Sequence, residues 1–413
     1  MRGTFRNRTQ LAALGLFSLA LLTPRPAAAQ GDDSQTVPTF RSESNLVVVP
    51  VEVRDSAGRP VRNLQVQDFR ILQNHKEQRI ASLDEIQGAA DPTAPQPASL
   101  AVPDGEAARA ATTSGSAGLQ HLILVFDQVN TEAVDQERGK EQLRKALQKF
   151  DRPDVAVSLV VVDRRGSRLA WGPRRGVNGL AAAIAALPAK PPVAYETGKD
   201  LLRAKDQVAV GMATSFSVRT LDASYQQVAI RSTLAAFRQI ASAYRAVRGK
   251  KIVLWVTGGF PFQASPAGSF GAGGNSTREF DLTFQILNDA QIAIYPVDVR
   301  GLSYVGLPTA DYPSTDLNQK HPEIHVDIVS AEQAATISTM EQVAEVTGGR
   351  AYVNRNDLSG VLTQAATDGD HYYLLAYKLD RSRLKPGFQT LQVRTARKHA
   401  AVRARSGFFI AAQ

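Results

Sequence analysis

The chain has 413 residues, of which 43% are hydrophobic and 21% are charged, and it contains no cysteine. At about 100–200 residues per domain, this length predicts two or three domains with a sizeable core. The apolar fraction excludes a disordered chain, and the lack of cysteine excludes disulfide scaffolds, thiolate zinc sites and cysteine nucleophiles. The formal net charge of +9 comes from 48 basic and 39 acidic residues, a surplus that favours a polyanionic partner if it is gathered on one surface.

The first 29 residues predict a secretory signal peptide. Three arginines precede an apolar run from Leu11 to Leu22, and Ala27-Ala28-Ala29 closes the segment with small residues. So short a run favours a cleaved leader over the alternative of an uncleaved membrane anchor, because a transmembrane helix needs about 20 apolar residues. No later stretch is apolar enough to cross a bilayer. We therefore expect export by the general secretory route to the periplasm or the exterior, with no transmembrane span after cleavage.

The positive charge is concentrated at the two ends of the chain. Four arginines lie in the leader, so cleavage after Ala29 lowers the charge from +9 to +5. Residues 371–413 hold nine basic residues and one acidic residue, a local charge of +8, which leaves −3 for residues 30–370. The surplus is therefore local, and export argues against a nucleic-acid partner.

Residues 371–413 predict a basic β hairpin that packs on the preceding domain. Basic and apolar residues alternate in Ala401-Val402-Arg403-Ala404-Arg405, as in a strand with one buried and one solvated face. The arginines either keep that outer face soluble or bind an acidic polymer of the cell envelope or cell wall. The candidates for such polyanion binding are Arg394, Arg397, Arg403 and Arg405.

Residues 36–88 predict a small β-rich domain. An apolar strand from Leu46 to Val53 ends at a turn over residues 55–60, and shorter strands follow near Phe69 and over residues 78–86. Residues 89–119 are rich in Ala, Pro and Ser and have no periodicity, which is typical of a flexible linker.

Residues 120–370 alternate between apolar runs and helical patterns. The runs predict strands buried on both faces of a parallel sheet, over residues 121–126, 155–162, 251–257, 291–297 and 350–353. Apolar residues at helical spacing predict helices over residues 132–150, 224–247, 277–288, 331–347 and 358–366. This alternation predicts an α/β domain with a doubly wound, Rossmann-like sheet.

Binding sites in such sheets form outside the carboxyl ends of the strands. Two loops meet there, one after the strand that ends at Asp127 and one after the strand that ends at Thr257. We therefore expect a partner-binding rim, with Asp298-Val299-Arg300 on the same edge. Its candidate residues are Asp127, Asn130, Thr131, Gly258, Gly259 and Phe260.

The strand that ends at Asp127, the strand before Gly258-Gly259 and residues 292–298 resemble a von Willebrand factor type A (vWFA) domain. The order of motifs along the chain is similar to that of the vWFA-related proteins typical of acidobacteria. The motifs are Val61-Arg62-Asn63-Leu64, Asp68-Phe69, Val125-Phe126-Asp127, Gly249-Lys250-Lys251, Gly258-Gly259-Phe260, Gly348-Gly349-Arg350-Ala351-Tyr352, Tyr372-Tyr373-Leu374-Leu375-Ala376-Tyr377 and Arg403-Ala404-Arg405-Ser406-Gly407-Phe408-Phe409. The resemblance implies a Rossmann-like adhesion fold and a binding role without catalysis.

The resemblance also implies a metal-ion-dependent adhesion site, written Asp-x-Ser-x-Ser with a later Thr and a later Asp. Asp127 and Thr131 match this pattern and Thr220 is a candidate for the later Thr, whereas Val129 and Gly258 stand where oxygen ligands are expected. We expect a degenerate site with no cofactor or at most weak Mg²⁺ binding. In the alternative, Asp127 caps the next helix or holds the rim loops by hydrogen bonds.

His321 and His325 have the i, i+4 spacing of a metal-binding pair. Pro322 between them argues against a helix here and favours a polar loop. With rim carboxylates, this pair would be the centre of an envelope hydrolase, although no recognisable catalytic constellation accompanies it.

The sequence as a whole favours an exported, non-enzymatic module that binds a protein partner in the cell envelope or outside the cell through the strand-end rim. Envelope polyanion binding by the C-terminal hairpin is the alternative, and an envelope hydrolase is the less favoured one.

Overall fold

The computed structural model describes residues 46–87, 120–190, 214–247, 249–260, 275–301, 322–355, 358–380 and 384–410. The side chains of residues 214–225, 275–277 and 322–333 are not described. The predicted signal peptide (1–29) and linker (89–119) lie outside the described residues. In the described part of the chain, no helix is long and apolar enough to cross a membrane.

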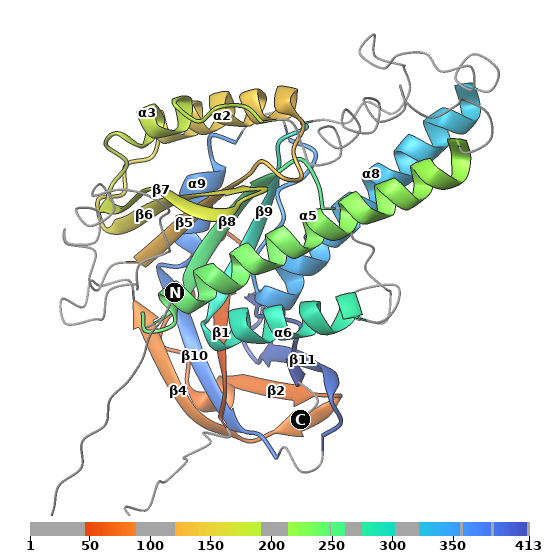
Figure 1. Ribbon diagram of the computed structural model, residues 1–413. Coiled ribbons are helices and arrows are strands. Elements are labelled where there is room, and N and C mark those ends of the chain that lie inside the picture. Colours follow the sequence, from red (N-terminus) through yellow and green to blue (C-terminus); the bar gives the residue numbers. More distant parts are fainter. Residues whose placement is uncertain are drawn as a thin grey trace, which may run out of the picture. The chain divides into compact units, whose positions relative to one another are not determined.

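A five-stranded mixed sheet forms the centre of the α/β part (Figure 1). In spatial order its strands are β7 (Gly166–Arg175), β6 (Val155–Asp163), β5 (Gln120–Asp127), β8 (Lys251–Thr257) and β9 (Ile292–Asp298). All neighbours pair in parallel except β7, which runs antiparallel to β6. Every residue of β6, β8 and β9 is buried, which explains why these strands are continuous apolar runs.

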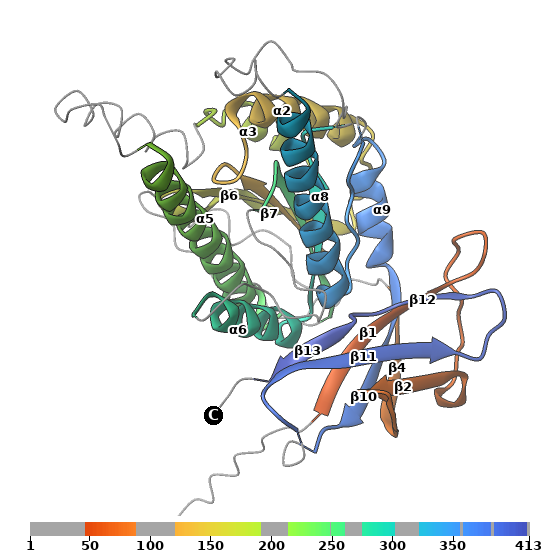
Figure 2. The ribbon, with the colours of Figure 1, turned by 90° about the vertical axis from the view of Figure 1, so that its right-hand side faces the viewer.

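Helices cover both faces of this sheet (Figures 1 and 2). Leu122 and Leu124 of β5 pack with one group of helices, and Ile123 and Val125 pack with the other. The first group is α2 (Ala133–Gln148), α3 (Leu180–Ala185) and α9 (Val361–Asp368), and the second is α5 (Thr214–Tyr244), α6 (Asn275–Asp289) and α8 (Pro322–Thr347). This arrangement confirms the predicted α/β class with a doubly wound sheet.

Four elements of this part differ from the sequence prediction. The strand predicted over residues 350–353 is only an isolated bridge between Tyr352 and Val297, and helix α3 was not predicted. Strand β7 was not predicted, because its residues include Arg168, Arg174 and Arg175 and no apolar run. Helix α8 begins at Pro322, so the stretch predicted as a polar loop starts a helix instead. The first helical position tolerates proline, since its missing N–H has no acceptor inside the helix.

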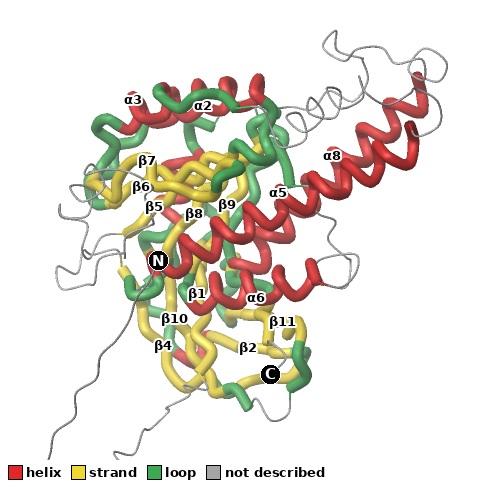
Figure 3. The backbone as a smooth tube through the Cα atoms, viewed as in Figure 1, coloured by secondary structure: helices red, strands yellow, loops and turns green. Residues whose placement is uncertain are grey.

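The remaining strands form two four-stranded sheets, which Figure 3 shows beside the α/β part. One sheet has the order β12 (Ala401–Arg403), β1 (Leu46–Arg54), β10 (His371–Lys378), β4 (Ile80–Gln87). The other has the order β13 (Gly407–Ile410), β11 (Gly387–Thr395), β2 (Phe69–Gln73), β3 (Lys76–Gln78), and a short 3-10 helix, η1 (Val66–Asp68), precedes β2. Side chains from both sheets share one core, to which Val49, Tyr373, Ile71 and Leu391 contribute. The two sheets therefore form a β sandwich.

The C-terminal strands pair with the N-terminal strands. β10 lies between β1 and β4, and β11 lies between β2 and β13. The sequence predicts a small domain over residues 36–88 and a separate hairpin over residues 371–413 that packs on the α/β domain. β11 and β13 do form an antiparallel pair, but residues 371–410 also complete the sheets begun by residues 46–87. Pairing between strands about 300 positions apart leaves no local signal in the sequence, and the predicted domain boundaries stay predictions.

Candidate functional site

The carboxyl ends of β5 and β8 lie side by side at the point where the strand order reverses. From β5 the chain proceeds to β6 on one side, and it later returns to place β8 on the other side. Phe126 of β5 is in register with Val256 of β8, and Thr257 is in register with Asp298 of β9. The structure thus brings the loops after Asp127, Thr257 and Asp298 to one edge, where open α/β sheets bind ligands.

Asp127 is buried at this edge and accepts hydrogen bonds from five donors. Oδ1 accepts the backbone N–H groups of Val129 (2.9 Å) and Asn130 (3.1 Å). Oδ2 accepts Nδ2 of Asn130 (2.7 Å), Nε1 of Trp255 (3.0 Å) and the hydroxyl of Thr257 (3.1 Å). Burial raises the pKa of the Asp127 carboxyl, and hydrogen bonds from Asn130 and Trp255 oppose that rise. The carboxylate therefore ties the loop after β5 to β8.

A second set of contacts joins the two loops directly. The hydroxyl of Thr131 accepts the backbone N–H of Gly258 (2.8 Å), and Nδ2 of Asn130 also donates to the hydroxyl of Thr233 on α5 (2.8 Å). A Cβ atom at position 258 would lie 3.2 Å from the backbone oxygen of Asn130, which is tighter than ordinary contact. Gly258 thus permits the close approach of the loops.

Phe260 is an anchor of the β8 loop. Its side chain is only 3% exposed, and its ring contacts Trp255 at 5.3 Å and Phe280 at 5.9 Å between centroids. Asp127, Thr131 and Gly258 are also buried. Most of the rim residues predicted from the sequence therefore shape the rim from inside and are not available to contact a partner.

Among the described residues, the exposed part of the rim is the first turns of α2. Val134 is 65% exposed, the most exposed large hydrophobic side chain among the described residues, and Glu132 beside it is also exposed. Arg138 donates to Asp135 (2.5 Å) and to the backbone oxygen of Arg300 (2.9 Å), which joins α2 to the turn after β9. Val134 was not among the candidate residues, because the sequence shows it only as one apolar residue in the first turn of a predicted helix, two positions after Glu132.

Asp298 holds Arg300 at the same edge, where the sequence analysis expected residues 298–300. Its guanidinium donates to both carboxylate oxygens of Asp298, at 3.0 Å and 2.7 Å, in a bidentate pair. Asp298 is 1% exposed, so this ion pair is largely withdrawn from solvent.

The described residues do not fit a Mg²⁺ site. Around Asp127, N–H donors of Asn130 and Trp255 occupy positions where a cation would need oxygen ligands, and Val129 supplies no side-chain oxygen. No cluster of three or more acidic or histidine side chains occurs in the described part of the chain. Thr220 lies in α5 and His325 in α8, but their side chains, and residue His321 altogether, lie outside the described residues.

The structure does not place the four candidate polyanion-binding arginines on one surface. Arg394 and Arg397 are exposed, but Arg405 is 7% exposed and Arg403 is 22% exposed. Arg403 donates to Asp368 (2.5 Å) and lies 3.5 Å from Glu52. Two of the four arginines therefore serve internal contacts.

Arg403 belongs to a buried charge network that was not predicted. Nζ of Lys250 pairs with Glu52 and lies 3.2 Å from the hydroxyl of Tyr295, and Arg54 pairs with Asp368 at 3.0 Å. Glu52, Lys250 and Asp368 are each less than a tenth exposed. The network links β1 and β12 of the sandwich to β8, β9 and α9. Its only signal in the sequence is a glutamate within the apolar strand from Leu46 to Val53.

Comparisons with known proteins found structural neighbours alone. No family model matches the chain, and no curated protein does. An aerotolerance-related membrane protein from Bacteroides fragilis is 12% identical and aligns over 61% of this chain and 98% of its own, with a TM-score of 0.31. The SpRpn10 VWA domain is 10% identical over 60% and 95% of the two chains, with a TM-score of 0.26. The pilus adhesin SpaC from Lactobacillus rhamnosus GG is 10% identical over 84% and 48%, with a TM-score of 0.31. Because these scores are low, the fold assignment rests on the strand order itself.

Proposed function

We propose that this chain is an exported, non-enzymatic binding module of the vWFA-related kind typical of acidobacteria. It recognises a protein partner in the cell envelope or outside the cell through the strand-end rim. The export in this proposal rests on the leader-like residues 1–29. The family rests on the order of sequence motifs.

The observation that carries the proposal is a rigid rim with an exposed apolar side chain on it. Asp127 and its five donors fix the backbone that leads into α2, so the first turn of α2 presents Val134 from a preorganised position. Glu132, two residues before Val134, and Arg138, four residues after it, are also exposed and carry opposite charges. An apolar side chain with a charged border is the composition of a protein–protein contact, and preorganisation lowers the entropy lost on binding.

Metal is not required in this proposal. Asp127 already has a donor at each lone pair that a cation would use, and its role is to position the loop. Recognition through Val134 and its charged neighbours is therefore expected to be unaffected by EDTA. Of the four arginines considered for polyanion binding, Arg394 and Arg397 are exposed. For an envelope hydrolase, the described residues offer no cluster of acidic and histidine side chains that could act as its catalytic centre.

Site-specific photo-crosslinking in the native envelope tests this proposal. A photoreactive amino acid at position 134 is expected to give one defined crosslinked product, with or without EDTA. The matched control is position 66 in η1 of the β sandwich, where the native valine is 43% exposed. Equal labelling from positions 134 and 66, or no product from position 134, would exclude the rim as the binding surface.

A further inference from the structure

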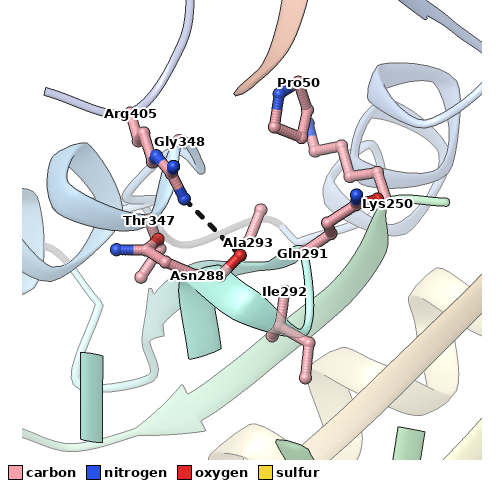
Figure 4. A pocket seen from close by; sticks show the side chains of 9 residues that line it. All are labelled: Pro50, Lys250, Asn288, Gln291, Ile292, Ala293, Thr347, Gly348 and Arg405. Carbon is pink, nitrogen blue, oxygen red and sulfur yellow. Dashed lines mark hydrogen bonds between the residues drawn. The ribbon is translucent and has the colours of Figure 1, made fainter. Parts of the chain in front are cut away.

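A small cavity lies where the β sandwich meets the α/β sheet (Figure 4). Its volume is about 20 Å³, and its walls come from β1, the end of α6, the start of β9 and the residues between β12 and β13. A cavity of this size holds one water-sized particle. Carboxylates, phosphates and sulfates are too large to enter it.

Arg405 lines this cavity as a buried cation without a paired acid. It is 7% exposed, and in the described part of the chain no carboxylate oxygen lies within ion-pair distance of its guanidinium. Its hydrogen-bond and ring partners are neutral: Nη2 lies 3.2 Å from the backbone oxygen of Val48, Nη1 lies 3.5 Å from that of Asn288, and the group lies 5.7 Å from the Phe408 ring centroid. Asp289 acts on it only as a longer-range charge.

Two buried N–H donors on this cavity have no acceptor among the described residues. One is Nε of Arg405 and the other is Nδ2 of Asn288, a side chain that is 5% exposed. Figure 4 shows Arg405 extending toward Asn288 across the cavity. Lys250 also lines the cavity, but its ammonium is already paired with Glu52. Leaving such donors unpaired destabilises the folded state, and more so for a charged group.

The electrostatics at Arg405 agree with this geometry. Burial lowers the pKa of the Arg405 guanidinium to about 10, against opposing effects from Tyr377 and Asp289. A buried cation is stable only when a counter-charge or hydrogen-bond acceptors replace the lost water. The residues in contact with Arg405 supply no such charge.

We propose that this cavity binds a single monovalent anion of the size of chloride, held by Nε of Arg405 and Nδ2 of Asn288. The ligand accepts hydrogen bonds and donates none, which suits two donors that lack acceptors. Gln291 lines the same cavity, where its Oε1 is buried without a donor among the described residues, so its amide has to turn by 180° to present the N–H2 group to an anion. With the N–H2 group turned inward it supplies a third donor.

The bound anion would join the sandwich to the α/β sheet. Arg405 follows β12 and contacts the backbone of β1 through Val48, whereas Asn288 lies in the last turn of α6, next to β9. An anion between them neutralises the buried cation and bonds to both parts at once. Halide concentration then sets the stability of this junction, independently of the rim.

Thermal unfolding of the full mature chain in matched salts tests the proposal. At constant ionic strength, replacing sodium gluconate by sodium chloride should raise Tm by about 2–4 °C once chloride exceeds its Kd about tenfold. Arg405→Met should abolish this rise, and the matched control Arg394→Met on exposed β11 should keep it. Where Arg405→Met fails to fold, Asn288→Ala serves as the second variant and should weaken the dependence. An identical Tm for the wild type in both salts would overturn the proposal.

Crystals grown in sodium bromide locate the ion. The anomalous difference map should show one peak between Nε of Arg405 and Nδ2 of Asn288, and none in crystals of Arg405→Met. A cavity that holds water in bromide, with no anomalous peak, would also overturn the proposal.

Discussion

At the scale of single residues, the position of Asp127 could be predicted from the sequence, but not all of its hydrogen-bond partners. Its position at the end of an apolar strand predicts a strand-end acid, and the alternative that it holds the rim loops agrees with its five hydrogen bonds. The donor from Trp255 could not be predicted, because it lies 128 positions away and belongs to a residue type that favours the core. Burial of Phe260 could not be predicted either, since its ring partners come from β8 and α6.

Asp127→Ala should destabilise the fold. The substitution leaves the buried N–H donors of Trp255 and Val129 without an acceptor, so the free energy of unfolding should fall by about 2–4 kcal/mol in urea titrations. Glu141→Ala, on the exposed face of α2, is the control and should change it by less than about 0.5 kcal/mol. A stable Asp127→Ala protein that has lost Mg²⁺ binding would identify Asp127 as a metal ligand instead.

Lys251 should make stability depend on pH. Its ammonium is 2% exposed and donates to the backbone oxygen of Val247 (2.7 Å), and burial lowers its pKa to about 7. Between about pH 7 and 10 the unfolded chain keeps this proton and the folded chain releases it, so stability rises with pH across that window.

Urea midpoints at several values between pH 7 and 10 measure this effect. Lys251 alone should change the unfolding constant by about tenfold per pH unit, and Lys251→Met should remove that contribution. Lys149→Met, at an exposed position, should leave the pH profile unchanged. Parallel profiles for the wild type and Lys251→Met would show that Lys251 stays charged in the folded state.

At the scale of elements, strands buried on both faces and amphipathic helices were predictable, whereas the edge strand β7 was not. β6, β8 and β9 are continuous apolar runs because helices cover both faces of the sheet. β7 is an edge strand with arginines on it, and its sequence therefore carries no such run. The Gly348-Gly349-Arg350 motif also has a packing explanation, because a Cβ at Gly349 would lie 1.9 Å from the backbone oxygen of Ile294 in β9.

Gly349→Ala should therefore be severely destabilising. The added methyl group can fit only if α8 and β9 separate, which should cost about 3 kcal/mol or more or prevent folding. Gly360→Ala is the matched control, since nothing lies within 4 Å of the added Cβ and the backbone there is right-handed. Soluble expression and urea unfolding measure both, and equal stability of the two variants would contradict the close approach at Gly349.

At the scale of the whole described chain, basic residues that suggested a polyanion partner instead join the sandwich to the α/β sheet. Arg403 and Lys250 share Glu52 within the buried network, Arg403 also pairs with Asp368, and Arg405 lines the cavity beside it. Charge counting along the sequence could not distinguish Arg403 and Arg405 from exposed Arg394, because all three are basic residues in strand-like segments with apolar neighbours. Only the pairing of β12 with β1 reveals their role.

Glu52→Gln should weaken this junction. It leaves the ammonium of Lys250 without its carboxylate in a buried site, which should cost about 3–5 kcal/mol in the free energy of unfolding. The double variant Glu52→Leu/Lys250→Met removes both charges and should recover most of that loss. Arg394→Ala provides the surface control. If Glu52→Gln and Arg394→Ala were equally stable, the network would contribute nothing to the junction.

The rim as a protein-binding surface is tested most directly by affinity for the partner that crosslinks at position 134. With the purified partner, Val134→Asp should raise Kd at least about tenfold, because it places a charge in an apolar contact. Val66→Asp, on η1 of the β sandwich, should change Kd by less than about twofold, and EDTA should have no effect. Equal Kd values for the two variants, or loss of binding in EDTA, would contradict recognition by a metal-independent rim.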